Sequence, residues 1–406
     1  MRGRALLLAA ILVAAGACNA EQTETPDQVT LTWWDYLNHS PMANQAVDNL
    51  LTRYRQEHPD VRIERTSLPY PEFRAKLAEA TASGVFPDIA AVDSTDLPRL
   101  AEGSALADLT DRFDRWDLGD EFLAPVRESV THGGRVHGVP LRSTTTALVY
   151  DRDHFAAAGL TDPPTTWEEL RTAAKALTTA DRAGLCFGGK DDDLTVTFLP
   201  LLWQAGGDVD GIGDQASLDA LAHLDGLVNT DRSTPAEVLG WTDADARQRF
   251  AEGRCAMAIT GPAAIPDLNQ AGLDWAAAPL PEGAAGGAGQ LGGEAWVIGR
   301  SGRVDEAWDV LTWLAEHPDN VTEFGGGLGA LPNRADTLDD LAWQWDPNVV
   351  GFTGGLREAR TRTAYGARYP EISRALATMA TRVLTGERRP DQATAEARAE
   401  IDRLPR

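Results

Sequence analysis

The 406-residue chain has few cysteines and histidines and, after its first 17 residues, no long apolar run. The three cysteines and seven histidines are not grouped at the spacings of a zinc site, and no cofactor is implied. No later apolar stretch approaches the roughly 20 residues that a membrane-spanning helix needs, so we expect everything after it to be soluble. The His-Glu-x-x-His motif of metalloproteases and the Gly-x-Ser-x-Gly motif of serine hydrolases are both missing.

Positive charge is also scarce. The 37 Lys and Arg residues against 61 Asp and Glu give a formal net charge of −24 at pH 7. Nucleic acids and anionic lipid surfaces attract basic proteins, so this balance argues against both as partners. With 43% hydrophobic residues and 12 Trp, the chain can bury sizeable cores, and its length favours two domains over a single small one.

The first 17 residues have the pattern of a removable export signal. Arg2 and Arg4 precede an apolar run of 13 residues, Ala5 to Ala17, which is too short to cross about 30 Å of hydrocarbon. Everything after the signal is therefore expected outside the cell.

A cysteine follows this run directly. Ala15-Gly16-Ala17-Cys18 resembles a bacterial lipobox, although the usual Leu three residues before the cysteine is Ala15 here. The resemblance implies that Cys18 is lipidated and anchors the protein to the outer face of the plasma membrane through acyl chains only. Ordinary secretion after cleavage near Ala17 or Ala20 is the alternative. Residues 18–28 are polar and are expected to be a flexible linker.

Two cysteines remain, Cys186 and Cys255, both in short apolar segments that could be neighbouring strands. An even pair in an oxidising compartment favours one disulfide. Two buried free thiols are the alternative.

Segments of strand and helix periodicity alternate along the chain, which predicts α/β lobes with mostly parallel sheets flanked by helices. The expected strands are 29–34, 61–65, 87–92, 136–140 and 146–150, and the expected helices are 43–57, 71–83 and 166–177.

Eight short motifs occur in one order between Val29 and about Gly386. They are Trp33-Trp34-Asp35-Tyr36, Glu57-His58-Pro59-Asp60-Val61, Ser83-Gly84-Val85-Phe86-Pro87-Asp88-Ile89, His137-Gly138-Val139-Pro140 with Leu148-Val149-Tyr150-Asp151, Pro164-Thr165-Thr166-Trp167-Glu168-Glu169-Leu170, Phe250-Ala251-Glu252-Gly253-Arg254-Cys255-Ala256-Met257, Thr260-Gly261-Pro262 and Leu291-Gly292-Gly293-Glu294. Together they resemble the extracellular solute-binding proteins, carbohydrate type, of ABC importers.

That resemblance implies a two-lobed periplasmic-binding-protein-like fold, each lobe a mixed sheet flanked by helices, with crossover hinge strands and a sugar in the cleft. Lobe one would be residues 29–139 plus 262–316, and lobe two residues 140–261 plus 317–406. The crossings would fall near Pro140, Gly261-Pro262 and His317-Pro318. The partners implied are a sugar and the membrane permease, and the protein would be a monomer without catalytic activity.

A sugar needs polar groups for its hydroxyls and aromatic rings for its flat apolar faces. The ligand-binding candidates are Trp33, Trp34, Asp35, Tyr36, Asp93, Ser94, Arg142, Ser143, Thr144, Trp203, Trp241, Gly261, Glu294, Trp296, Arg360, Arg362 and Tyr365. We expect one of the two adjacent tryptophans to point into the lobe and the other, with Asp35 or Tyr36, to reach the cleft.

Several candidates have competing structural explanations. The tryptophans could instead pack in the core, and Asp93 or Ser94 could instead cap a helix. Residues 142–145 could instead form a strand without ligand contact. A surface acid is the alternative for Glu294, and a solvated salt bridge for Arg360 and Arg362. The chain also departs from its relatives, because Ala263 follows Gly261-Pro262 where a large stacking residue is common, and Trp241 or Trp296 could replace it.

Two other functions stay open. A non-sugar polar solute such as a polyol phosphate would need a denser cationic site than Arg142, Arg360 and Arg362 provide. A glycoside-active enzyme would need two carboxyl groups about 5–10 Å apart across the bond, and the sequence alone does not place Asp35, Asp93 and Glu294 at such separations.

Overall fold

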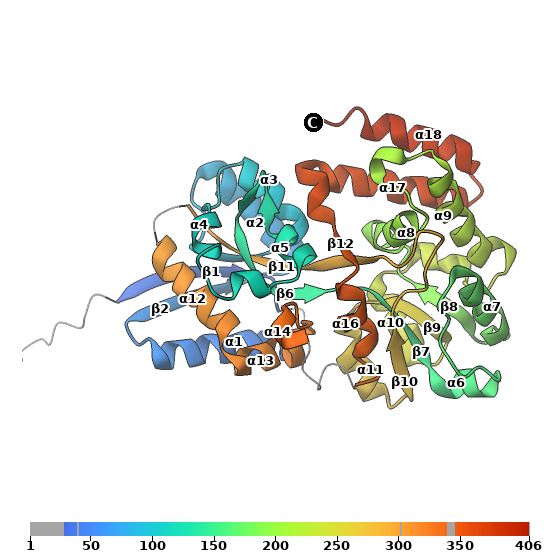
Figure 1. Ribbon diagram of the computed structural model, residues 1–406, viewed down its shortest axis with the longest axis horizontal. Coiled ribbons are helices and arrows are strands. Elements are labelled where there is room, and N and C mark those ends of the chain that lie inside the picture. Colours follow the sequence, from blue (N-terminus) through green and yellow to red (C-terminus); the bar gives the residue numbers. More distant parts are fainter. Residues whose placement is uncertain (1–27, 39, 301–302, 339–345, 406) are drawn as a thin grey trace, which may run out of the picture.

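The computed structural model describes residues 28–38, 40–300, 303–338 and 346–405, which form two α/β lobes side by side (Figure 1). The predicted signal peptide, Cys18 and nearly all of the predicted linker lie outside the described residues. Within the described ranges, no helix is both long and apolar enough to span a membrane.

The first lobe is built on a six-stranded sheet with the order β12-β11-β3-β1-β2, in which β6 also pairs with β11. Its strands are β1 (Val29–Asp35), β2 (Val61–Ser67), β3 (Ile89–Asp93), β6 (Gly138–Thr144), β11 (Gly289–Ile298) and β12 (Ala359–Thr361). Its helices are α1 (Pro41–Glu57), α2 (Tyr70–Ser83), α3 (Leu97–Glu102), α4 (Thr110–Phe113), α5 (Ala124–Ser129), α12 (Val304–Glu316), α13 (Pro318–Leu328) and α14 (Ala335–Leu338), with a small hairpin of β4 (Thr131–His132) and β5 (Arg135–Val136).

Local chemistry accounts for these elements. Helix α1 begins where Ser40 accepts a hydrogen bond from the Ala43 N–H, with Pro41 in the first turn. Strand β3 is buried over four of its five residues because helices cover both faces of the sheet, with α2 and α3 on one side and α1 and α13 on the other (Figure 1).

The second lobe is built on a four-stranded sheet with the order β10-β7-β9-β8. Its strands are β7 (Ala147–Asp151), β8 (Ala183–Phe187), β9 (Cys255–Thr260) and β10 (Trp275–Ala278). Its helices are α6 (Arg152–Ala157), α7 (Trp167–Leu177), α8 (Asp192–Gln204), α9 (Gln215–Asp225), α10 (Asp243–Ala251), α11 (Ile265–Ala271), α16 (Val350–Leu356), α17 (Tyr369–Leu384) and α18 (Pro390–Ile401).

A disulfide joins two neighbouring strands of this sheet. Cys186 in β8 and Cys255 in β9 are bonded, with their Cα atoms 6.0 Å apart. Both side chains are buried, and β8 and β9 run parallel. This is the bond expected from the sequence.

The lobe boundaries differ from the sequence expectation. Strand β6 pairs with β11 through Thr144, so the first crossing comes after Thr144 and not near Pro140. Strand β10 pairs with β7 in the second sheet, so the chain does not return to the first lobe at Gly261-Pro262. It returns between β10 and β11. Which sheet a strand joins depends on its pairing with a strand distant in the chain, and the local sequence does not identify that partner.

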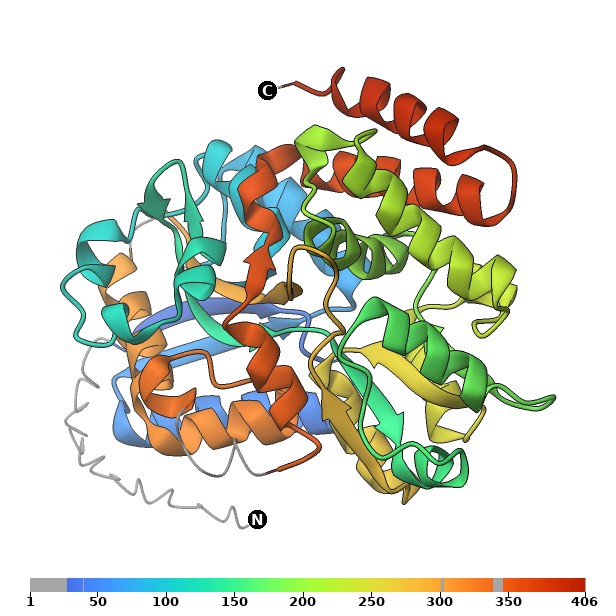
Figure 2. The same ribbon diagram turned by 45° about the vertical axis from the view of Figure 1, so that its right-hand side comes forward.

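The last third of the chain also departs from the expected division. Helix α13 packs against α1 and α12, so the chain stays in the first lobe after His317-Pro318. After α16, strand β12 rejoins the first sheet beside β11, and α17 then returns to the second lobe. Figure 2 shows this C-terminal segment, in orange and red, running along the boundary between the lobes.

Candidate ligand-binding cleft

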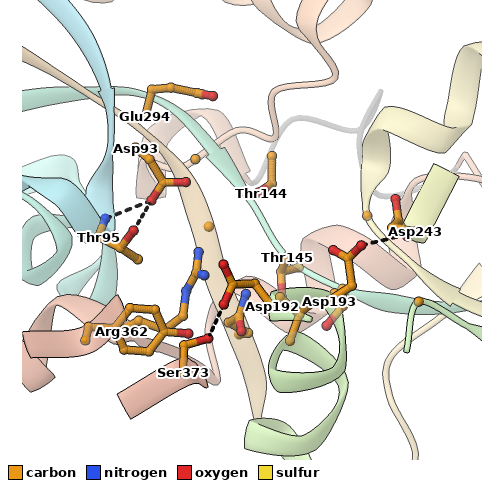
Figure 3. A pocket seen from close by; sticks show the side chains of 18 of the residues that line it. Asp93, Thr95, Thr144, Thr145, Asp192, Asp193, Asp243, Glu294, Arg362 and Ser373 are labelled. Atoms are coloured by element: carbon orange, nitrogen blue, oxygen red, sulfur yellow. Dashed lines mark hydrogen bonds between the residues drawn. The ribbon is translucent and has the colours of Figure 1, made fainter. Parts of the chain in front are cut away.

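A cleft of about 480 Å³ lies between the two lobes and is lined by residues of both. The first lobe contributes the ends of β1 and β3 and the start of α2. Further lining residues come from the crossover after β6 and from the start of β11. The second lobe adds the N-terminal turns of α8, α10 and α17 (Figure 3). A volume in this range is typical of small-molecule sites.

Glu294 and Arg142 form a buried ion pair that lines the cleft. The Arg142 Nη1 atom lies 2.8 and 2.6 Å from the two carboxylate oxygens of Glu294, and its Nε donates to the Leu328 carbonyl at 2.8 Å. The Tyr36 hydroxyl donates to the same carboxylate at 2.8 Å. Burial, followed by the Glu294 charge, raises the pKa of Tyr36 well above its ordinary value. Burial alone would lower the pKa of Arg142, but Glu294 raises it overall, so the guanidinium stays charged.

Two glycines let β11 approach β6 beside this pair. A Cβ on Gly293, whose φ is 114°, would lie 2.1 Å from the Arg142 carbonyl oxygen, and one on Gly292 would lie 2.8 Å from the Thr144 Oγ1. Glycine therefore allows the contact between the strands, and both glycines also line the cleft.

On the first-lobe wall, Asp93 lines the cleft and also fulfils its alternative, capping role. Its Oδ1 accepts from the Thr95 N–H at 2.8 Å and from the Thr95 hydroxyl at 2.6 Å. Ser94 is buried and does not line the cleft. Tyr70 stands 4.8 Å from Tyr36 between ring centroids and provides an aromatic surface.

The second-lobe wall is acidic. Asp192 accepts from the Ser373 hydroxyl at 2.7 Å, and Asp193 accepts from the Asp243 N–H at 3.1 Å. Asp243 is paired with Arg247, whose Nε lies 3.1 Å from its Oδ2. Burial raises the pKa of Asp193 and of Asp243 above the ordinary value.

Several buried polar atoms that line the cleft have no hydrogen-bond partner among the described residues. They are the hydroxyls of Thr145 and Thr146, the Gln290 Oε1 and the Arg362 Nε. Buried polar groups are nearly always paired, so their convergence on one cleft makes it the candidate site for a polar ligand.

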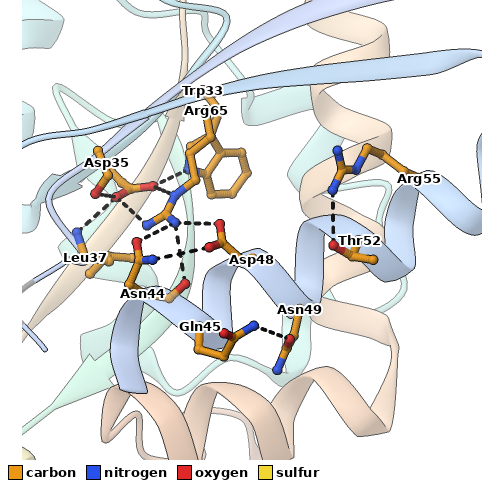
Figure 4. Close-up of polar contacts among 11 residues, drawn as sticks. Trp33, Asp35, Leu37, Asn44, Gln45, Asp48, Asn49, Thr52, Arg55 and Arg65 are labelled. Carbon is orange, nitrogen blue, oxygen red and sulfur yellow. Dashed lines mark hydrogen bonds and ion pairs between the residues drawn. The ribbon is translucent and has the colours of Figure 1, made fainter. Parts of the chain in front are cut away.

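The first strand divides its candidates between core and surface, as alternation predicts. Trp33 is buried and donates from Nε1 to Asp35 at 2.8 Å. Asp35 is fully buried and is held by Arg65 through two bonds of 2.7 and 3.0 Å, so it does not reach the cleft (Figure 4). Trp34 points to the other face, where Lys76 covers its ring at 4.1 Å. Of the four candidates in this motif, Tyr36 is the one that lines the cleft.

Other candidates lie away from the cleft. Ser143 accepts from the Asn333 amide at 3.0 Å, Trp296 is fully buried against Phe324, and Arg249 covers the Trp241 ring at 3.9 Å.

Three more candidates form a separate polar cluster. Trp203 donates to the Tyr365 hydroxyl at 2.9 Å, which in turn donates to Asp208 at 2.5 Å, and Arg360 pairs with the same aspartate at 2.8 Å. None of the three residues lines the cleft.

The structure therefore brings together Tyr36, Asp93, Arg142, Thr144, Gly261, Glu294 and Arg362 from the sequence candidates. Sequence reasoning missed Tyr70, Arg74, Thr95, Thr146, Asp192, Asp193, Asp243, Gln290, Tyr369 and Ser373. The run Asp191-Asp192-Asp193 before an apolar helix was a usable signal, because it puts carboxylates on a helix N-terminus at a loop. No comparable sequence signal marks Tyr70 and Tyr369 as cleft residues.

A family model described as bacterial extracellular solute-binding protein matches residues 40–321, more than half of the chain. The chain belongs to this family. Its two lobes and interlobe cleft are the family architecture that the motifs implied.

Solved structures of family members superpose closely on the chain. The cyclic alpha-maltosyl-1,6-maltose binding protein from Arthrobacter globiformis is 27% identical, with a TM-score of 0.80, and the match covers 92% of this chain and 98% of that one. An ABC transporter solute-binding protein from Thermotoga lettingae, bound with alpha-D-tagatose, is 25% identical with a TM-score of 0.80, and 92% and 99% of the chains are covered. A relative from Streptomyces antibioticus, described as an uncharacterized lipoprotein, is 28% identical over 94% of this chain and 88% of its own length.

Proposed function

We propose that this protein is the substrate-binding lipoprotein of an ABC importer, capturing a mono- or oligosaccharide in the cleft and delivering it to the membrane permease. The observation that carries the proposal is the convergence of unpartnered Thr145, Thr146, Gln290 and Arg362 atoms on a cleft that both lobes line. The solved relatives that bind a cyclic oligosaccharide and tagatose support a sugar as the ligand class.

The cleft suits a sugar better than a phosphorylated polyol. Tyr36, Tyr70 and Tyr369 supply aromatic surfaces for apolar sugar faces, and the threonine hydroxyls both donate and accept. Of the three arginines that line the cleft, Arg142 is committed to Glu294 and Arg74 to Asp96. A phosphate would meet mainly carboxylates, which repel it.

Two of the three carboxyl groups considered for a glycosidase are committed to ion pairs. Asp35 is buried in its ion pair with Arg65, and Glu294 is committed to Arg142 and Tyr36. The family and the solved relatives named above are binding proteins. We therefore infer reversible capture without chemistry.

Closure of the two lobes would complete the site. The crossover at Thr145 and Thr146 and the return before β11 connect the lobes. Thr145 and Thr146 line the cleft, as does Gln290 at the start of β11. A ligand that bonds both walls favours the closed form by the contacts that only this form makes. The closed, loaded monomer is then the form that docks on the permease.

Arg362 should matter for binding, while its neighbour Arg360 should not. Arg362 lines the cleft with an unpartnered Nε, so we expect Arg362→Ala to weaken sugar binding by about tenfold or more, the usual consequence of losing a bond to a charged group. Arg360→Ala is the matched control, because Arg360 is half-exposed and pairs with Asp208 outside the cleft.

The measurement is a titration of the mature protein with a library of mono- and oligosaccharides, followed by tryptophan fluorescence and calorimetry. Hits are then repeated with both variants. A library without any saturable signal would contradict sugar capture. Equal affinity in the two variants would remove Arg362 from the site.

The membrane anchor is a separate part of the proposal. Cys18 lies outside the described residues, and its lipobox context together with the relative described as a lipoprotein supports lipid attachment. We expect Cys18→Ala to release the protein from the membrane fraction and to impair uptake, while sugar affinity is unchanged because a linker separates anchor and cleft. Cell fractionation and labelling with a radioactive fatty acid measure this. Absence of label in the unaltered protein would contradict the anchor.

A further inference from the structure

The cleft carries more negative charge than its own cations neutralise. Arg74 pairs with Asp96, Arg142 with Glu294, and Arg247 with Asp243. Asp93, Asp192 and Asp193 line the cleft without an ion pair among the described residues, and Arg362 is the cleft-lining cation left to balance them. Burial lowers the pKa of Arg362, whereas the charges of Tyr369 and then Asp93 raise it, and the overall shift is upward. Two carboxylates on the second-lobe wall are thus left uncompensated.

Helix capping does not account for these two carboxylates. Asp192 and Asp193 are the first residues of α8, a position that favours acidic side chains. Neither, however, accepts a hydrogen bond from an α8 N–H. Asp192 uses one oxygen on Ser373 of α17, and Asp193 uses one on the Asp243 N–H of α10. The second oxygen of each carboxylate has no partner among the described residues, and Figure 3 shows both side chains at the cleft wall.

A metal ion is a poor match for this wall. Among the described residues, no group of three His, Cys, Asp or Glu side chains is arranged to hold one. The unpartnered polar atoms at the crossover, on Thr145 and Gln290, belong to residues that are 2% and 5% exposed. Hydroxyl and amide oxygens accept hydrogen bonds from a polyol, so these groups fit the hydroxyls of a sugar that also touches the acidic wall.

We propose that the captured sugar carries a protonated amino group and that Asp192 and Asp193 bind it. This inference rests on the proposed function, in which the cleft holds a sugar. Closure takes the second-lobe wall out of water, and an uncompensated buried charge opposes that step. A neutral sugar leaves both carboxylates uncompensated, whereas an ammonium group compensates them and donates up to three charge-assisted hydrogen bonds.

The test uses matched pairs of sugars that differ only in the amino group, namely glucose and glucosamine, galactose and galactosamine, and cello- and chitosan oligosaccharides, with the N-acetylated forms as a third arm. We expect the amino member of the recognised pair to bind about tenfold or more tighter than the neutral one, with N-acetylation removing the advantage. The advantage should also fall as salt is raised.

Variants then assign the effect to the wall. Asp192→Asn and Asp193→Asn should each remove most of the preference for the amine, because an amide oxygen still accepts from Ser373 or from the Asp243 N–H but carries no charge. Asp219→Asn, an exposed carboxylate on α9 outside the cleft, is the control and should change nothing. If Asp193→Asn does not fold, Asp192→Asn decides alone.

The outcomes separate the inference from the function on which it rests. Saturable binding of neutral sugars with equal or higher affinity overturns the amino-sugar inference and leaves sugar capture standing. A preference for the amine that persists in both asparagine variants overturns the assignment to Asp192 and Asp193. Absence of binding by every sugar, neutral or amino, overturns sugar capture and the inference together.

Discussion

Glu294→Ala is expected to lower the free energy of unfolding by about 3–5 kcal/mol, because it leaves the buried Arg142 guanidinium without its counter-charge. The two side chains are 5% and 11% exposed, so solvent screens the pair little. We expect the same change to weaken sugar binding by about a hundredfold or more, since Arg142 and Tyr36 lose the group that holds them at the cleft and each bond to a charged group is worth about 1.5–3 kcal/mol.

Asp35→Ala is the matched control for this effect. Asp35 is also a buried carboxylate held by an arginine in the first lobe, but it does not line the cleft. We expect the Asp35→Ala variant to lose a similar amount of stability. At a temperature where the variant remains folded, its sugar affinity should be unchanged. Thermal and urea unfolding, with titrations on the folded variants, measure both quantities. Unchanged affinity in folded Glu294→Ala would remove the ion pair from the binding site.

Replacing both Cys186 and Cys255 with serine is expected to lower the free energy of unfolding of the second lobe by about 2–5 kcal/mol. The bond closes a loop with a sequence separation of 69 residues, for which the loss of unfolded-chain entropy corresponds to about 4 kcal/mol. Neither cysteine lines the cleft, so sugar affinity below the unfolding transition should be unchanged.

Urea unfolding with and without a reducing agent, compared with the double variant, measures this contribution. The unaltered protein under reducing conditions and the variant should unfold at similar urea concentrations. Cys18→Ala is the control, because it removes a cysteine without touching the bond. A double variant as stable as the unaltered protein would show that the bond contributes nothing in solution.

The fold was predictable from the sequence to the level of its elements. The strand expected at 29–34 is β1 (Val29–Asp35), and the helices expected at 43–57 and 71–83 are α1 and α2 with starts shifted by one or two residues. These elements have clear apolar periodicity and local caps, which a single sequence carries. The lobe boundaries were wrong at β6, β10 and α13 because pairing between distant strands and packing between distant helices decide them.

The cleft was predictable only in part. Glu294, Arg142 and Tyr36 were candidates individually, and their joining into one ion-paired unit depends on the antiparallel register that places Glu294 opposite Arg142 and Asp93. The sequence analysis placed too many tryptophans in the cleft. Trp33 and Trp296 are buried in the core, and Trp203 and Trp241 make contacts outside the cleft. Tyrosines line the cleft instead.

The sequence by itself was enough to indicate the solute-binding class, most of the elements and the cysteine pair, because each depends on short motifs or on composition. The export and lipidation signals stay predictions. Only the tertiary structure decided which charges face one another. Asp192 and Asp193 meet the cleft because α8 packs against α17 and α10 across a long stretch of chain. Asp35, equally acidic, is neutralised by Arg65 in the interior. The same residue type is thus a structural counter-ion at one position and a candidate ligand contact at another, since the neighbours that set its charge balance come from distant parts of the chain.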